Sequence, residues 1–365
     1  MRTHTAITST IAMGAFAALV LSGCGAAPAE PDPGAGASDF LPCAVSDLTG
    51  FDDNDFNELT FNGVKAAAES FGAEPKATES ASEDQYAGNI DALVGEGCDF
   101  IVTVGFALAA ATRDSALVNT DVNFALIDST VANDDFSPLE LDNVKPVLFD
   151  TAQAAVLAGY LAAGASTTGM VGTYGGMPFP SVTVFMDGFS DGIDHYNEVH
   201  GASVQLVGWD KAAQDGLFVG SFDDQNQAKV LTSGLLDQNV DVIMPVAGTL
   251  FTASIEAMID RGTEGAIIGV NSDAFVSTPE YSSYYLTSVL KNLTTAAEVV
   301  TTAAGNGEFD NTSYIGTLEN GGVDIAPTHE WEDKLDPALL DEVEELKAQI
   351  IDGTFVVESP SSPKI

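Results

Sequence analysis

Polar and aromatic residues recur directly after the apolar runs that this sequence predicts as strands. Carboxylate, amide and ammonium groups bind polar solutes through hydrogen bonds, and aromatic rings stack on planar ones. A single acid at a strand end usually caps the next helix, but several at successive strand ends favour a binding site. The residues in such positions are Asp47, Phe106, Asp128, Gly175, Gly176, Gly248, Asn271 and Lys291.

No segment matches a known catalytic or metal-binding signature. The histidines are His4, His195, His200 and His329, and none belongs to a recognisable triad or metal pair. The glycine-rich segment 172–176 has neither Walker nor dinucleotide-binding spacing. The acidic segment 52–55 lacks the spacing and the final Glu of an EF-hand. We therefore expect a protein that is not an enzyme and needs no metal or cofactor.

Acidic residues greatly outnumber basic ones. The 365-residue chain has 54 Asp and Glu against 12 Lys and Arg, a formal net charge of −42. This balance argues against a nucleic-acid-binding protein, since phosphate contacts need clustered cations. A hydrophobic content of 45% still supplies material for real cores. The charge is typical of a solvated surface suited to a salty medium, with a cation-binding role as the alternative.

The N-terminus carries a targeting signal. Arg2 is followed by an apolar run at 11–21, which is short for a membrane span and typical of a signal peptide. The run ends in Leu-Ser-Gly-Cys at 21–24, which resembles the bacterial lipobox. We expect residues 1–23 to be removed, Cys24 to be lipidated, and 24–39 to form a flexible tether. The protein would then be held at the outer face of the cell membrane by its lipid alone. The alternative is an ordinary cysteine in a secretory signal.

Apolar runs of strand and helix period alternate from residue 40 onwards. Strands are predicted at 40–46, 100–104, 123–128, 170–174, 203–207, 240–244 and 266–270, and helices at 56–71, 86–94, 107–117, 152–163, 182–196, 225–238 and 253–261. Strict alternation predicts parallel sheets with right-handed crossovers. The series breaks near 167–169, so we expect two lobes whose strand C-termini face a shared cleft.

Two cysteines remain beyond Cys24, namely Cys43 and Cys98. With 76–78 as a short second strand, a sheet of order 2-1-3 makes the first and third strands parallel neighbours. Such strands lie about 4.8 Å apart, and a disulfide needs Cα atoms about 4.4–6.8 Å apart. We expect a disulfide at the strand N-termini, away from the cleft. The alternative is two free buried thiols.

The order of motifs along the mature chain resembles the basic membrane protein family, whose members are lipoprotein substrate-binding components of ABC transporters. The matching segments are Ser46 with Asp47, 53–57 with Gly63, 124–128, 157–163, 172–176, 185–189, 220–224, 240–243, 268–273 and 286–291. No single motif is decisive, but their shared order is specific.

The resemblance implies a type I periplasmic-binding-protein-like α/β fold, with two doubly wound parallel-sheet lobes around a ligand cleft. Lobe 1 would comprise 40–168 with 290–312, lobe 2 would comprise 169–289 with 313–352, and 353–365 would form a C-terminal tail. The expected ligand is a purine nucleoside, which a monomeric receptor would deliver to the permease subunits. The alternatives are another small polar solute, such as a sugar, and, in a different class, a nucleoside-processing hydrolase.

The resemblance also implies roles for individual residues. Phe56 would stack on the base, Asp128 would accept hydrogen bonds from base nitrogens, and Lys291 would donate to ribose oxygens. Asp47 and Asn57 would fix the orientation of the ligand. Without a ligand role, Phe56 would cap the helix–sheet core and Lys291 would form a surface salt bridge.

The sequence departs from the family pattern at two places. The family commonly has Asp at the position of Asn271, which is expected to accept from ribose hydroxyls, and Asp273 could substitute for it. The segment that begins at Gly248 lacks a second glycine. The second wall of the base site stays open between Met244, Phe179 and Phe222. We expect Met244, Gly248, Asn271 and Asp273 to complete the ligand-binding set.

Overall fold

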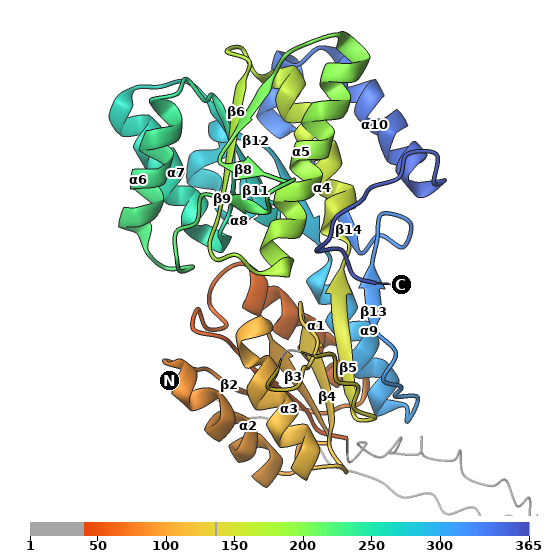
Figure 1. Cartoon of the computed structure of the whole chain (residues 1–365). Coiled ribbons are helices and arrows are strands. Elements are labelled where there is room, and N and C mark those ends of the chain that lie inside the picture. The colour runs from red at the N-terminus through yellow and green to blue at the C-terminus, as the bar shows by residue number, and fades with distance from the viewer. Residues whose placement is uncertain (1–39, 136, 365) are drawn as a thin grey trace, which may run out of the picture. The chain divides into compact units, whose positions relative to one another are not determined.

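Two six-stranded sheets, each covered by helices, make up the described part of the chain, which is residues 40–135 and 137–364 of a computed structural model (Figure 1). Residues 1–39, for which the sequence predicts the signal peptide, the lipidated Cys24 and the tether, lie outside this part. Each described helix is too short or too polar to span a membrane. The two-lobed α/β architecture predicted from the alternation of elements is confirmed.

The first lobe holds a parallel sheet of order β13-β5-β4-β3-β1-β2. Its strands are β1 (Pro42–Val45), β2 (Lys76–Thr78), β3 (Phe100–Val104), β4 (Asn123–Ile127), β5 (Val144–Phe149) and β13 (Tyr314–Gly316). Helices α1 (Phe56–Ser70) and α9 (Leu293–Gly305) pack together on one face, and α2 (Tyr86–Gly95) and α3 (Ala109–Val118) on the other. Successive residues of β3 alternate between these two cores, as expected for a strand buried on both faces.

The second lobe holds a sheet of order β14-β12-β11-β10-β6-β7, in which only β14 is antiparallel to its neighbour. Its strands are β6 (Met170–Gly175), β7 (Gln205–Val207), β10 (Val242–Val246), β11 (Ala266–Asn271), β12 (Tyr285–Lys291) and β14 (Val323–Ile325), with a hairpin of β8 (Trp209–Asp210) and β9 (Asp215–Gly216) beside them. Its helices are α4 (Thr151–Ala165), α5 (Pro180–His200), α6 (Gln225–Leu236), α7 (Phe251–Arg261), α8 (Ala274–Ser277) and α10 (Pro337–Ile351).

Five short 3-10 helices lie in the connections of both lobes. They are η1 (Glu83–Gln85), η2 (Phe106–Leu108), η3 (Gly248–Leu250), η4 (Pro279–Tyr284) and η5 (His329–Lys334). Two of them, η2 and η3, directly follow the strands β3 and β10. They therefore bring Phe106 and Gly248 to the strand ends that face the cavity described below.

The chain passes between the lobes after β5, after β12 and after β13. The lobe boundaries predicted from the sequence therefore need two corrections. Helix α4 packs on α5, α10, β12 and β14, so the first passage falls near Asp150 and not at 168. Strand β13 pairs with β5 and belongs to the first sheet, whereas the family resemblance predicts 313–352 in lobe 2.

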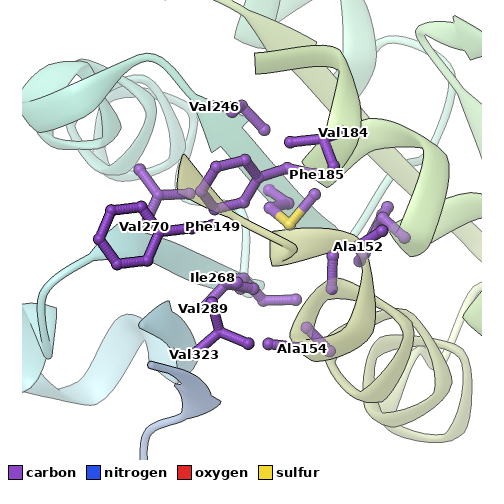
Figure 2. Close-up of a cluster of buried hydrophobic side chains, with 14 of the residues drawn as sticks. Phe149, Ala152, Ala154, Val184, Phe185, Val246, Ile268, Val270, Val289 and Val323 are labelled. Atoms are coloured by element: carbon purple, nitrogen blue, oxygen red, sulfur yellow. The ribbon is translucent and has the colours of Figure 1, made fainter. Parts of the chain in front are cut away.

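Close packing of α4 on α5 explains the position of α4. A Cβ atom at Gly159, Gly188 or Gly192 would collide with the backbone of the facing helix, so glycine lets the two helices approach closely. Figure 2 shows Ala152 and Ala154 of α4 and Phe185 of α5 in one apolar cluster with valines of the second sheet. An alanine-rich helix that is buried on several sides is stabilised by such a partner, and lobe 2 supplies it.

The C-terminal tail is fastened to lobe 2 and to the first passage between the lobes. Ser359 Oγ donates to Asp187 Oδ2 over 2.6 Å, and Lys211 Nζ donates to the carbonyl of Glu358 over 2.6 Å. Ser362 Oγ donates to Asp150 Oδ1 over 2.7 Å. Because Asp150 directly follows β5, the tail reaches the point where the chain leaves lobe 1.

A disulfide joins Cys43 and Cys98, whose Cα atoms are 6.0 Å apart. Strand β1 lies between β2 and β3 with Cys43 level with Ile101, so the predicted order 2-1-3 is confirmed. Cys98 lies two residues before β3, and both cysteines are buried. The bond therefore braces the N-terminal ends of the strands, while Asp47 lies beyond the opposite end of β1.

We predict that replacing both Cys43 and Cys98 by Ala lowers the free energy of unfolding by about 2–4 kcal/mol, because the bond closes a loop of 55 residues in the unfolded chain. Urea unfolding of the variant and of the wild type, both without reductant, measures the difference. Ligand affinity should not change. Two alkylatable thiols in the denatured, unreduced wild type, apart from Cys24, would contradict the bond.

Candidate functional site

A cavity of about 360 Å³ lies where the C-terminal ends of the strands of both sheets meet. Asp47 follows β1, Phe106 follows β3 and Asp128 follows β4, whereas Asn271 and Lys291 end β11 and β12. All five line the cavity, because parallel strands bring their carboxyl ends to one edge of a sheet. Asp128 and Asn271 adopt left-handed backbone angles, φ 60° and 65°, which Asp and Asn tolerate best among residues with a side chain.

Aromatic rings from both lobes form the walls of this cavity. Phe56 is the first residue of α1, and Phe106 of lobe 1 lies with its ring centroid 3.7 Å from that of Phe179 of lobe 2. The ring centroids of Phe222 and Phe106 are 6.1 Å apart, and Phe185 of α5 also lines the cavity. Both lobes therefore contribute aromatic surface to the cavity lining, and the rings of Phe106 and Phe179 touch each other.

Lys291 and Asp128 form an ion pair that joins the two lobes. The side chains are only 3% and 8% exposed, so the pair is buried, in contrast to the surface salt bridge that was the alternative for Lys291. Burial raises the pKa of Asp128, and Lys291 opposes this shift. The Lys291 ammonium also lies 4.9 Å from the ring centroid of Phe185 and 5.7 Å from that of Phe56, within the range of cation–π attraction.

Asn57 positions Asp47 and does not line the cavity. Its Nδ2 donates to Asp47 Oδ1 over 2.9 Å and to Asp53 Oδ2 over 3.0 Å, while its Oδ1 accepts from the Asp47 backbone N–H. Thr49 donates two further hydrogen bonds to the same Asp47 oxygen. Burial nevertheless raises the pKa of Asp47. All polar side-chain atoms of Asn57 are used inside the loop in this structure. Its expected contact with the ligand stays a prediction.

Met244 and Asp273 also lie outside the cavity. Met244 is fully buried in the middle of β10, where the strand is covered on both faces. Asp273 caps α8 through the Phe275 N–H at 3.1 Å and lies 2.8 Å from His329 Nε2. The expected contacts of these two residues with the ligand stay predictions. Of the three candidates for the second wall, Phe179 and Phe222 line the cavity.

Asp55 is a cavity residue that the sequence did not single out. It precedes α1 and is 3% exposed, and its Oδ2 accepts from Asn271 Nδ2 of the other lobe over 2.9 Å. Burial raises its pKa to about 7. From the sequence it resembles a helix N-cap, yet its side chain makes no capping bond. The signal in the sequence is its position at the end of the acidic segment 52–55, directly before Phe56.

The lining is strongly acidic. Its carboxyl groups belong to Asp47, Asp53, Asp55, Glu83, Asp128 and Asp223, against one ammonium group on Lys291. Such a field favours neutral or cationic molecules over anions. Residues 40–135 and 137–364 contain no group of three or more His, Cys, Asp or Glu arranged to hold a metal ion. The arrangement can bind a small planar and polar molecule between the lobes.

Known proteins are similar to this chain in sequence and in fold. Residues 41–359 match the family described as ABC transporter substrate-binding protein PnrA-like. The chain is 30% identical over 273 residues to "Basic membrane protein A" of Borreliella burgdorferi, which covers 75% of this chain and 74% of the relative. It is 26% identical over 385 residues to "ABC transporter nucleoside-binding protein BmpA" of Lactococcus lactis subsp. cremoris, covering 98% of this chain and all of the relative.

A similar solved structure is that of an ABC transporter solute-binding protein from Aeropyrum pernix K1, with a TM-score of 0.75 at 23% identity over 87% of this chain and 94% of that one. This likeness supports the predicted periplasmic-binding-protein-like fold. The family match covers nearly all of the described residues and both walls of the cavity. This chain therefore belongs to the family of PnrA-like substrate-binding proteins of ABC transporters, whose members bind solutes and are not a class of enzymes.

Proposed function

We propose that this protein binds a purine nucleoside in the cavity between its lobes and delivers it to the permease of an ABC transporter. The observation that carries the proposal is the aromatic lining of the cavity, in which Phe56 and Phe185 lie beside the buried Lys291–Asp128 ion pair. A nucleoside has one planar, hydrogen-bonding base and one polyhydroxylated sugar, which match these two kinds of surface. The name of the Lactococcus relative, a nucleoside-binding protein, supports the same ligand.

In this proposal the base lies against Phe56 and the phenylalanines of lobe 2, and stacking contributes about 1–3 kcal/mol per base. Asp128 accepts a hydrogen bond from a base N–H with the oxygen that is not bonded to Lys291. Lys291 has three donors, of which Asp128 takes one, so the ammonium can also donate to sugar oxygens. Asp47, Gly248 and Asn271 complete the contacts.

An ion pair and a hydrogen bond between the lobes suggest how ligand binding is coupled to closure of the lobes. The Lys291–Asp128 and Asn271–Asp55 pairs both run from one lobe to the other beside the cavity. Opening must break them and expose the cavity, while a bound ligand adds contacts to both lobes and favours closure. The three chain passages near Asp150, Asn292 and 317–322 serve as the hinge.

The lipobox-like motif supports a lipid anchor on Cys24, with the mature protein at the extracytoplasmic face of the cell membrane. A single lobe pair with one cavity is sufficient for binding, so we propose a monomer.

A sugar remains the second candidate ligand, because aromatic walls with carboxylates also suit a polyhydroxylated ring. A hydrolase would need an activated water and a general base placed against the same ligand.

Isothermal titration calorimetry with adenosine, guanosine, inosine, free ribose and adenosine 5′-monophosphate tests the ligand class. At least one nucleoside should bind, and the monophosphate should bind about tenfold more weakly or worse than adenosine, since its phosphate would face an excess of carboxylates. Binding of ribose without any nucleoside would contradict the proposal. Turnover of a nucleoside, followed by chromatography, would favour the hydrolase.

Phe56→Ala should lower nucleoside affinity by about 1–3 kcal/mol through lost stacking. Lys291→Ala and Asp128→Ala should each lower it by about 1.5–3 kcal/mol, because a charged hydrogen bond is lost and a buried charge is left unpaired. Phe275→Ala and Lys229→Ala are controls, since both side chains lie outside the cavity. Wild-type affinity in all three site variants would show that the ligand binds elsewhere.

Cys24→Ala should release the protein from membranes or block its processing, because the thiol that would carry the lipid is missing. Membrane fractionation and the intact mass of the purified protein measure both effects, with Ser38→Ala in the tether as the control. An unchanged mass and unchanged membrane association would rule out the anchor.

A further inference from the structure

One carboxylate oxygen in the cavity wall has no hydrogen-bond partner. Asp55 Oδ2 accepts from Asn271 Nδ2, but Asp55 Oδ1 is buried without a partner among the described residues. The Asp55 backbone is held on both sides, because its N–H donates to Asp53 Oδ1 over 3.0 Å and its carbonyl accepts from the Leu59 N–H. A buried polar atom left unpaired costs about 1–3 kcal/mol, and more when it is charged.

The groups around Asp55 act on its pKa in opposite directions. Burial and the neighbouring Asp53 carboxylate raise its pKa to about 7, while the Asn271 amide, the Ser272 hydroxyl and the Lys291 ammonium oppose the shift. Near neutral pH both the ionised and the protonated forms are therefore present. The ionised form offers Oδ1 only as an acceptor, and the protonated form can offer it as a donor.

We propose that Asp55 Oδ1 hydrogen-bonds a hydroxyl group of the ligand while Oδ2 keeps its bond to Asn271. A hydroxyl fits because it both donates and accepts, so it can pair with Oδ1 whether or not that oxygen carries a proton, whereas an amino group of a base needs an Oδ1 without a proton. One carboxyl group then connects the ligand to both lobes. This inference rests on the proposed function and adds a specificity-determining residue to it.

This connection of the ligand to both lobes through the Asp55 carboxyl group, here the Asp55 bridge, affects selectivity. A ligand that lacks the hydroxyl leaves Oδ1 buried and unpaired in the closed protein, so the penalty falls on the wrong ligand. The loss of one charge-assisted hydrogen bond corresponds to about tenfold to a hundredfold in affinity. Asp55 would thus select for hydroxyl-bearing ligands at this position.

Deoxynucleosides test the bridge. For the tightest of adenosine, guanosine and inosine, the affinities of the parent and of its 2′-, 3′- and 5′-deoxy analogues are measured by calorimetry on wild type, Asp55→Ala and Asp55→Asn. In the wild type, one analogue should bind about tenfold or more weakly than the parent. In Asp55→Ala, that analogue and its parent should bind within about threefold of each other, and Asp55→Asn should fall between the two. Asp52→Ala, which removes an exposed acid from the same loop, should keep the wild-type pattern.

A purely structural role for Asp55 predicts a different pattern. Asp55→Ala would then weaken the parent and all three analogues by the same factor and keep the discrimination, which would overturn the bridge. If Asp55→Ala does not fold, as judged by thermal unfolding, the Asp55→Asn series decides by the same criterion. Equal binding of all analogues by the wild type would also overturn it. Failure of the wild type to bind any of the three parent nucleosides would overturn the proposed function itself.

Discussion

The two-lobed arrangement depends on the buried ion pair between the Lys291 ammonium group and the Asp128 carboxylate. Lys291 ends β12 in one lobe, pairs with Asp128 at the end of β4 in the other, and is surrounded by the rings of Phe56, Phe149 and Phe185. A buried ion pair loses much of its Coulombic gain to desolvation, so it is poor at adding stability. It is good at fixing geometry, because each charge without its partner is strongly unfavourable in that apolar setting.

Hydrogen bonds stabilise the other carboxyl groups that are buried in the cavity wall. Asp47, Asp53 and Asp55 lie on the same side of the cavity within one short loop, and burial raises the pKa of both Asp47 and Asp55. Hydrogen bonds from Thr49 and Asn57 to Asp47, and from Asn271 to Asp55, stabilise charge that Lys291 does not neutralise directly. Side-chain amides and hydroxyls thus stabilise one oxygen each of Asp47, Asp53 and Asp55.

Sequence reasoning located the cavity because its rule is local: residues that follow parallel strands share one edge. That rule placed Asp47, Asp128, Asn271 and Lys291 at the cavity. It could not separate Asn271 from Asp273, because the two residues lie on either side of a turn and only one faces the cavity. Nor could it place Met244, since a strand that is covered on both faces offers only its end to a ligand. Strand β5, the lobe of α4 and the pairing of β13 depend on contacts far apart in the sequence, which alternation alone does not encode.

The pairing of β13 with β5 also has a consequence for the order in which the chain can fold. Strand β13 (Tyr314–Gly316) completes the edge of the first sheet, and α9 (Leu293–Gly305) covers one of its faces, although the other strands of that sheet end at Phe149. Until about residue 316 has been synthesised, the edge of β5 and the apolar face that α9 will cover are exposed, and unpaired edges of this kind promote association between chains. The first lobe therefore cannot mature ahead of the second during synthesis, and a chain cut before β13 should aggregate and should not yield a soluble N-terminal half.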